Sequence, residues 1–168
     1  MRRTEYDLLV DYDVFGDERI QLLDGQLVTM SPQTARHAGI VEALNERLMP
    51  ALVGTARVRL PMAAGEHSEP EPDIAVVPAD EPRDRHPQRA LLVIEVADSS
   101  LALDLVRKAR IYAAAGVPVY WVIDVAGDVV HVHTDPGGQG YASVTRHSAD
   151  ETLDACGVSV ALRELRST

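Results

Sequence analysis

Two apolar, β-branched runs near the middle of the chain each contain an acidic side chain that a buried strand would not favour. The runs cover residues 71–77 and 91–96, and the two acids are Asp73 and Glu95. Runs rich in Val and Ile, bounded by Pro and polar residues, are typical of strands. Since an ionised side chain is costly to bury unless it is paired or binds a metal, these acids restrict how the chain can fold.

The two runs are predicted to be neighbouring strands joined by the segment 78–89, which would bring Asp73 and Glu95 to one point. Two hard oxygen ligands at one point are typical of a Mg²⁺ or Mn²⁺ site, which keeps water and accepts a phosphate oxygen. The pair by itself leaves an alternative open, in which both carboxylates lie at strand ends in solvent or face an arginine.

Length and composition favour one compact domain. The chain has 168 residues, 46% of them hydrophobic, so we expect a single domain over residues 1–168 with residues 1–18 as a peripheral arm. The longest apolar run is too short to span a bilayer, and no apolar signal segment follows Met1. We therefore expect a cytoplasmic protein with no membrane partner. The single cysteine, Cys156, excludes an internal disulfide framework and a zinc cage built from cysteines.

The net charge of the chain limits how it could bind nucleic acid. A formal net charge of −10 argues against coating nucleic acid through bulk electrostatics, because phosphate neutralisation supplies most non-specific affinity. Local basic faces are still compatible with this balance, although each group taken alone also fits a solvated surface. The basic groups are Arg57 with Arg59; Arg83, Arg85 and Arg89; and Arg107, Lys108 and Arg110.

The N-terminal segment is predicted to form a short helix and a hairpin. The helix covers residues 4–11 and would be capped by Thr4. The dipeptide at 24–25, Asp-Gly, supplies the positive φ values of a tight turn between strands at 19–23 and 26–30.

A second helix and a strand follow. Ser31 is the expected N-cap, with Pro32 in the first turn, and the helix ends before Pro50. Residues 57–60 then alternate as a strand continuing from Val53. The buried stripe of this helix comprises His37, Ile40, Val41, Leu44 and Leu48. A lone histidine on such a stripe is typically a hydrogen-bonded residue at the edge of the core.

The C-terminal half begins with a surface loop at 78–88. Asp73 precedes this loop and is the first residue after the prolines at 70 and 72 that can join a sheet fully. Its carboxylate is therefore expected at the entrance of a strand. A helix over 101–115 would bury Ala102, Leu105, Val106, Ala109 and Tyr112 or Ala113. Asp104 and Lys108 lie beside this stripe as i,i+4 neighbours, which alone indicates an ordinary surface ion pair.

The remaining segments are predicted strands, of which 117–124 is central and covered on both faces. His131 and His133 share one face of a later strand, and two histidines at that spacing can bind zinc, but no third ligand is apparent nearby. The later strands cover 129–133, 141–145 and 158–162.

The order of these elements resembles the core of the PD-(D/E)xK nuclease superfamily, and specifically the Uma-type (Uma-two) family of restriction-endonuclease-like proteins. The resemblance spans nearly the whole chain. It rests on QLLDGQL at 21–27, SP at 31–32 with His37, PDIA at 72–75, IEVADSSL at 94–101, Asp104 with Lys108, YAAAGVP at 112–118 and YWVID at 120–124.

The resemblance implies an α/β (α+β) fold with a restriction-endonuclease-like core: a central mixed sheet flanked by helices, an N-terminal β-hairpin and a C-terminal β-meander. It makes Asp73 and Glu95 the two acids of the superfamily motif. Ala97 occupies the usual lysine position, and Lys108 on the following helix is the matching lysine. Gln21 and Gln26 stand where relatives commonly carry acids, and Val119 replaces a frequent glutamate.

The implied activity is hydrolysis of nucleic-acid phosphodiester bonds, of DNA more than RNA, by a metal-dependent endonuclease that we expect to form a homodimer. Mg²⁺ or Mn²⁺ would be held by Asp73, Glu95 and the Val96 carbonyl, while Lys108 orients water or stabilises charge on the transition state. The auxiliary residues are His37, Asp104 and Gln21.

Two competing interpretations belong to other classes. The first is a catalytically inactive binding or assembly module with the same fold, which the acidic balance, the glutamines at 21 and 26, and an exposed Tyr120-Trp121 strand at a dimer interface would favour. The second is a zinc hydrolase centred on His131 and His133.

Overall fold

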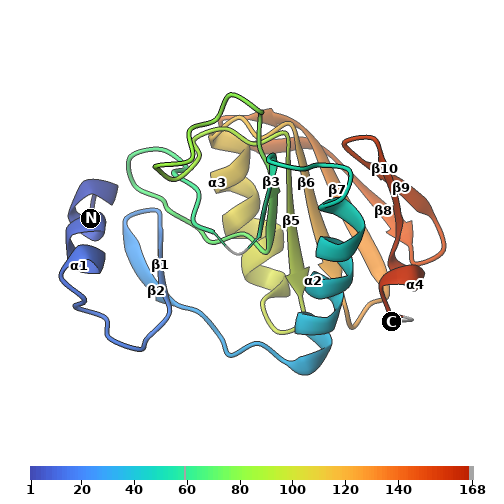
Figure 1. Ribbon diagram of the computed structural model, residues 1–168, viewed down its shortest axis with the longest axis horizontal. Coiled ribbons are helices and arrows are strands. Elements are labelled where there is room, and N and C mark those ends of the chain that lie inside the picture. Colours follow the sequence, from blue (N-terminus) through green and yellow to red (C-terminus); the bar gives the residue numbers. More distant parts are fainter. Residues whose placement is uncertain (59, 167–168) are drawn as a thin grey trace.

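A six-stranded mixed sheet forms the centre of the molecule (Figure 1). The computed structural model describes residues 1–58 and 60–166. In spatial order the strands of the sheet are β3 (Ala56–Val58), β4 (Ile74–Val76), β5 (Leu92–Ala97), β6 (Val119–Asp124), β7 (Val129–Gly137) and β8 (Gly140–Ser148). The β5–β6 pair is parallel and the other pairs are antiparallel, which confirms the predicted mixed sheet and its antiparallel meander.

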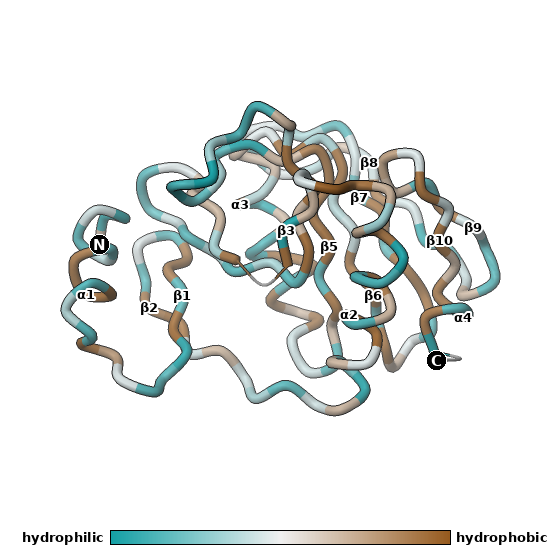
Figure 2. The backbone as a smooth tube through the Cα atoms, in the orientation of Figure 1, coloured by the Kyte–Doolittle hydropathy of each residue, from teal (hydrophilic) through white to brown (hydrophobic). Residues whose placement is uncertain are grey.

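Helices cover both faces of this sheet. The helix α2 (Ala35–Leu48) lies on one face, and the segments η1 (Leu103–Lys108) and α3 (Ala109–Ala114), which connect β5 to β6, lie on the other (Figure 1). The central strands β4, β5 and β6 therefore bury both faces, whereas β8 is largely exposed. The central strands are hydrophobic along much of their length in Figure 2. The strand residues that pack with α2 are Ile74, Val76, Ile94, Val96, Trp121 and Ile123, and those that pack with α3 are Ala75, Val93, Ala97, Tyr120 and Val122.

Smaller elements flank the sheet at its two ends. Asp24 and Gly25 adopt φ values of 46° and 75°, which confirms the predicted tight turn of the N-terminal hairpin. The smaller elements are α1 (Arg3–Asp11), β1 (Ile20–Leu23), β2 (Gln26–Thr29), β9 (Thr152–Ala155), β10 (Val158–Ala161) and α4 (Leu162–Leu165). None of the described helices combines the length and apolar character needed to cross a bilayer.

Several predicted boundaries and exposures are wrong. The N-cap of α2 is Thr34 and not Ser31, because the Thr34 hydroxyl accepts a hydrogen bond from the His37 amide at 3.1 Å. Thr4 lies inside α1, where the Glu5 carboxylate accepts from the Arg2 amide at 2.7 Å and so takes over the capping role. The strand predicted at 57–60 is β3, Ala56–Val58, and Arg59 lies outside the described residues.

The β6 strand is central, as predicted, and this excludes a dimer interface built on Tyr120 and Trp121. Both side chains are buried within the protein. Tyr120 packs against Tyr112 and Tyr141, with ring centroids 5.0 and 6.0 Å apart, and Trp121 packs in the core beneath α2.

The segment before β4 ties the N-terminal hairpin to the rest of the chain through Glu69. The Glu69 amide donates to the Leu22 carbonyl at 2.7 Å, and its carboxylate lies 3.7 Å from both Arg3 and His86. Burial, followed by the nearby Asp7 carboxylate, raises the pKa of Glu69 to about 7.

This shift predicts a pH-dependent stability term. The folded state holds the Glu69 proton more tightly than the unfolded state, so the contribution is fully present below about pH 4.5 and is lost as pH rises through about 7. We expect the free energy of unfolding of the wild type, relative to Glu69→Gln, to fall by about 3 kcal/mol between pH 4.5 and 8. Urea unfolding across this range measures it, with the exposed Glu66→Gln as control. A difference that does not change with pH would contradict the prediction.

Candidate functional site

The register of β4 and β5 brings Asp73 and Glu95 together. Ile74 pairs with Ile94 in this antiparallel ladder, so the next residues outward along the pair, Asp73 and Glu95, lie opposite one another on the face that α3 covers. Both side chains are buried, at 8% and 3% exposure. They line one cavity of about 100 Å³ together with Gln21, His37, Val96 and Lys108.

Asp73 is held through one of its two oxygens. Oδ2 accepts a hydrogen bond from the Val96 amide at 2.8 Å and lies 3.0 Å from His37 Nε2. No described residue donates a hydrogen bond to Oδ1. His37 Nδ1 is buried and has no partner in the part of the chain that the structure describes, so the polar contact of the ring is made through Nε2, against the Asp73 carboxylate.

Glu95, like Asp73, is held through one of its two carboxylate oxygens. Its Oε1 accepts from the Tyr112 hydroxyl at 2.7 Å and from Lys108 Nζ at 2.9 Å, whereas no described residue donates to Oε2. Burial raises the pKa of Glu95 to about 8, although the Lys108 ammonium opposes the shift. Burial alone would lower the pKa of Lys108, but Glu95 and Asp104 raise it, so the lysine stays charged.

Lys108 lies at the end of a π-helical turn, which places its side chain in the site. The predicted stripe of the 101–115 helix is correct only for its C-terminal half, because Val106 is 62% exposed while Asp104 and Lys108 are buried. The segment η1, Leu103–Lys108, winds as a π-helix before α3 begins. Such a turn changes which side chains face the sheet and is frequent at functional sites.

Asp104 completes a buried ionic cluster, so a surface ion pair is the wrong description of it. Its Oδ1 lies 3.5 Å from Lys108 Nζ and has no hydrogen bond, while its Oδ2 accepts from the Ser100 hydroxyl. Burial raises the pKa of Asp104. The Tyr120 hydroxyl donates to the Asp104 backbone carbonyl at 3.0 Å, which anchors this turn to the sheet.

Gln21 lines the same cavity as the two acids, and its side-chain oxygen accepts from the Glu71 amide at 3.4 Å. The two histidines of the zinc interpretation lie outside this lining. His133 is buried between Tyr120 and Tyr141, with ring centroids 5.2 and 5.6 Å away. Across residues 1–58 and 60–166, no three His, Cys, Asp or Glu side chains are grouped to hold an ion, so the zinc interpretation centred on His131 and His133 gains no support.

Tyr112 is a site residue that the sequence pattern does not reveal. The pattern places it in the apolar stripe, yet its hydroxyl donates to Glu95. A signal was present, because a buried tyrosine normally finds a hydrogen-bond partner for its hydroxyl.

The acids that line the cavity, Asp73 and Glu95, offer two carboxylate ligands for a divalent cation, which would need water to complete its coordination because no three His, Cys, Asp or Glu side chains of the described residues are grouped to hold an ion. Asp73, Glu95 and Asp104 place three carboxylates in one buried cluster beside one ammonium, Lys108, which leaves an excess of negative charge unless a proton or a cation is bound. Asp73 Oδ1 and Glu95 Oε2 accept no hydrogen bond from any residue that the structure describes. Oxygen ligands with several retained waters are typical of Mg²⁺.

Removal of the ammonium should destabilise the metal-free protein. We expect Lys108→Met to lower the free energy of unfolding by about 3–5 kcal/mol, because Glu95 and Asp104 lose their counter-charge. Adding Glu95→Leu to this variant should restore part of the loss. Arg110→Met, which removes an exposed pair with Asp24, should cost less than about 1 kcal/mol. Urea unfolding in buffer with chelator measures all four proteins, and equal losses for the two single variants would contradict a buried cluster.

Comparison with known proteins places the chain in a family. Among solved structures, a crystal structure described as a putative nuclease belonging to DUF820 from Anabaena variabilis shares the fold, with a TM-score of 0.69, 16% sequence identity, and coverage of 94% of this chain and 97% of that chain. No curated protein matches. The model of the Uma2 family, described as "Putative restriction endonuclease", matches residues 4–163. The chain therefore belongs to the Uma2 family, as its sequence motifs predicted.

Proposed function

We propose that this protein is an endonuclease that hydrolyses phosphodiester bonds of nucleic acid with a divalent cation, acting on DNA in preference to RNA. One observation carries the proposal: Asp73 and Glu95 lie opposite one another at a cavity beside the buried Lys108 ammonium, and each keeps one oxygen to which no described residue donates. The description of the family as restriction endonucleases supports the same reaction class.

The proposed cation is Mg²⁺ or Mn²⁺, held by Asp73, Glu95 and the Val96 carbonyl, and when bound it supplies Lewis acidity toward water and phosphate. The protein's own task is to keep both carboxylates in place. The Val96 amide and His37 fix Asp73 through Oδ2, and Tyr112 and Lys108 fix Glu95 through Oε1. Hydrogen-bond partners of this kind orient metal-ligating groups.

Lys108 contributes positive charge to the reaction. Its ammonium lies 2.9 Å from Glu95 and lines the cavity that both acids share. A fixed cation in a site of low dielectric stabilises negative charge that develops on phosphate oxygens without having to reorganise first. Asp104 keeps the lysine at this position from the same helical segment. Ala97 occupies the motif position at which a lysine is usual. In this proposal Lys108 performs the function of that lysine.

Cleavage of supercoiled plasmid tests the proposal. We expect nicking by wild type with Mg²⁺ or Mn²⁺, and a loss of at least about 100-fold in Asp73→Ala and in Lys108→Met. Arg146→Gln, an exposed change on β8, should keep full activity.

Two outcomes would overturn this assignment. Cleavage that persists in Asp73→Ala would indicate a contaminant or a different site. Absence of cleavage by wild type on every DNA and RNA substrate would favour the inactive binding or assembly module. The homodimer and the cytoplasmic location stay predictions, as does the single domain over residues 1–168.

The role of Tyr112 has a separate test. We expect Tyr112→Phe to weaken Mn²⁺ binding by about 10-fold or more, because Glu95 loses a donor that orients it. Titration followed by Mn²⁺ electron paramagnetic resonance measures the affinity. Tyr141→Phe is the matched control, since Tyr141 donates to the Val117 carbonyl and not to an acid. Equal Mn²⁺ affinities in the wild type and Tyr112→Phe would contradict the orienting role.

A further inference from the structure

The structure separates the basic groups of the chain into those with internal partners and those without. Arg107 bonds Asp24, Gln26 and the Leu23 carbonyl, and Arg110 pairs with Asp24. Arg89 pairs with Asp80 and Glu81, and Arg85 with Asp84. Within the three basic groups named above, Arg57 and Arg83 are the described residues whose side chains make no ion pair or hydrogen bond. The exposed side chains of Arg36 and Arg146 elsewhere in the chain also make none with the residues that the structure describes.

Arg57 and Arg83 line one groove. It lies between α1 and the loop 78–91 and has a volume of about 630 Å³. Arg57 enters it from β3, and its Nε is shielded from solvent and has no hydrogen-bond partner among the described residues. Arg83 enters from the loop and is exposed. It rests on Gly54, where a Cβ would lie 2.7 Å from Nη2. A shielded guanidinium nitrogen without a partner requires an explanation, and an anionic ligand provides one.

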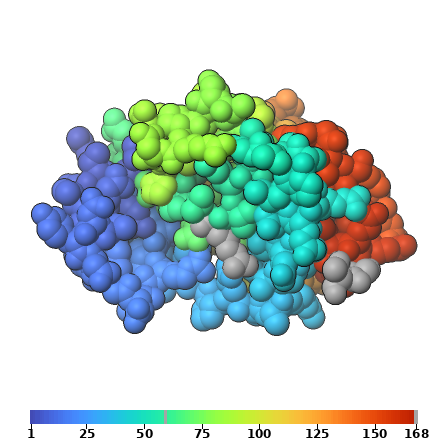
Figure 3. All heavy atoms as spheres, in the orientation of Figure 1, coloured from blue at the N-terminus to red at the C-terminus, as the bar shows by residue number. Residues whose placement is uncertain are grey.

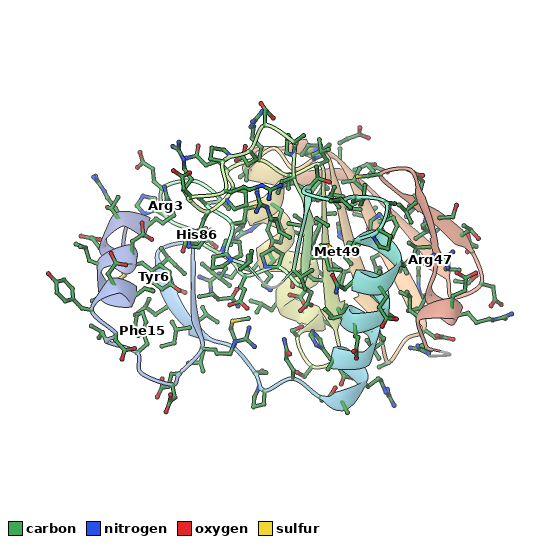
Figure 4. The ribbon with its side chains drawn as sticks, in the orientation of Figure 1. Arg3, Tyr6, Phe15, Arg47, Met49 and His86 are labelled. Carbon is green, nitrogen blue, oxygen red and sulfur yellow. The ribbon has the colours of Figure 1, made fainter. Side chains whose placement is uncertain are left out.

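Three of the four acids that line the groove face a residue other than Arg57 and Arg83, with Arg3 shared between two of them. Glu69 on its floor faces Arg3 and His86, which lie close together at this end of the molecule in Figure 4. Asp7 pairs with Arg3, and Asp84 with Arg85. Asp11, on the α1 side, is the remaining acid of the lining. The charges of Arg57 and Arg83 are therefore available to a ligand.

The groove adjoins the candidate active site. Glu69 lines the groove and Glu71 lines the cavity of Asp73 and Glu95, so an extended stretch of about 7 Å separates the two linings along the backbone. A duplex strand presents one phosphate per about 3.4 Å of helix axis. A nucleic acid in the cavity therefore has further phosphates within reach of the groove. The N-terminal segment, which forms one wall, occupies one end of the molecule in Figure 3.

We propose that this groove binds the phosphodiester backbone of the nucleic-acid substrate, with Arg57 and Arg83 as phosphate contacts a few nucleotides from the bond that is cut; the inference rests on the proposed nuclease function. A guanidinium suits this task because its planar fork binds phosphate oxygens in pairs. The groove adds affinity and register and reads no bases.

Salt-dependent binding tests the proposal separately from cleavage. A fluorescently labelled DNA duplex is titrated with the Asp73→Ala protein in chelator, and its anisotropy is followed at several salt concentrations. In this background we compare Arg57→Gln, Arg83→Gln, the double variant and Arg57→Lys, with Arg146→Gln as control. Arg146 lies on β8, at the opposite edge of the sheet from β3.

The double variant should bind at least about 10-fold more weakly at low salt, and the slope of log K against log salt should fall by about two, one unit for each lost phosphate contact. Arg57→Lys should keep most of the slope, and Arg146→Gln should change neither quantity. Loss of affinity with an unaltered slope would indicate a merely structural role and overturn the proposal.

The binding and cleavage results together test the groove separately from the proposed nuclease reaction. Unchanged binding in the double variant, while wild type cleaves plasmid, overturns the groove and leaves the nuclease proposal intact. A reduced slope in a protein that never cleaves supports the groove and overturns the nuclease. Absence of any DNA or RNA binding overturns the groove. Arg83→Gln alters an exposed side chain, so its result stands even if Arg57→Gln fails to fold.

Discussion

The buried contact between Lys108 and Glu95 is the interaction on which the site depends. Three carboxylates and one ammonium share a region that water scarcely reaches, where an unpaired charge is very costly. The fold accommodates the cluster by supplying donors around it: the Val96 amide and His37 for Asp73, Tyr112 for Glu95 and Ser100 for Asp104. The remaining negative charge is what makes the cavity suited to a cation.

Backbone geometry sets the positions of the cluster members. The antiparallel register of β4 and β5 places the two motif acids opposite one another, and the parallel β5–β6 pair requires a crossover connection, which η1 and α3 provide over that face. The π-helical turn then directs Asp104 and Lys108 inward. A layer of tyrosines, Tyr112, Tyr120 and Tyr141, packs beneath the site and carries hydroxyls to Glu95, to the Asp104 carbonyl and to the Val117 carbonyl.

The basic residues illustrate why net charge is a weak guide to function. The chain carries a formal charge of −10, and most arginines in its three basic groups are paired within the protein. A tally of lysines and arginines cannot separate these from Arg57 and Arg83, because pairing depends on residues far away in the sequence. In our proposal, the positive charges of Arg57 and Arg83 in the groove and a cation in the adjacent cavity bind the phosphate backbone, although the protein as a whole is acidic.

The sequence by itself determined the mixed fold, the hairpin turn at Asp24-Gly25, the central β6 strand, and the proximity of Asp73, Glu95 and Lys108. These features follow from residue periodicity, turn chemistry and family motifs, which act over short stretches. Tertiary structure alone decided that Asp104 and Lys108 are buried while Val106 is exposed, that the Tyr112 hydroxyl donates to Glu95, and that Arg57 Nε has no hydrogen-bond partner among the described residues. A π-helical turn departs from the 3.6-residue period on which stripe predictions rely, and the cost of burying a charge depends on every group around it, so neither can be read from local pattern.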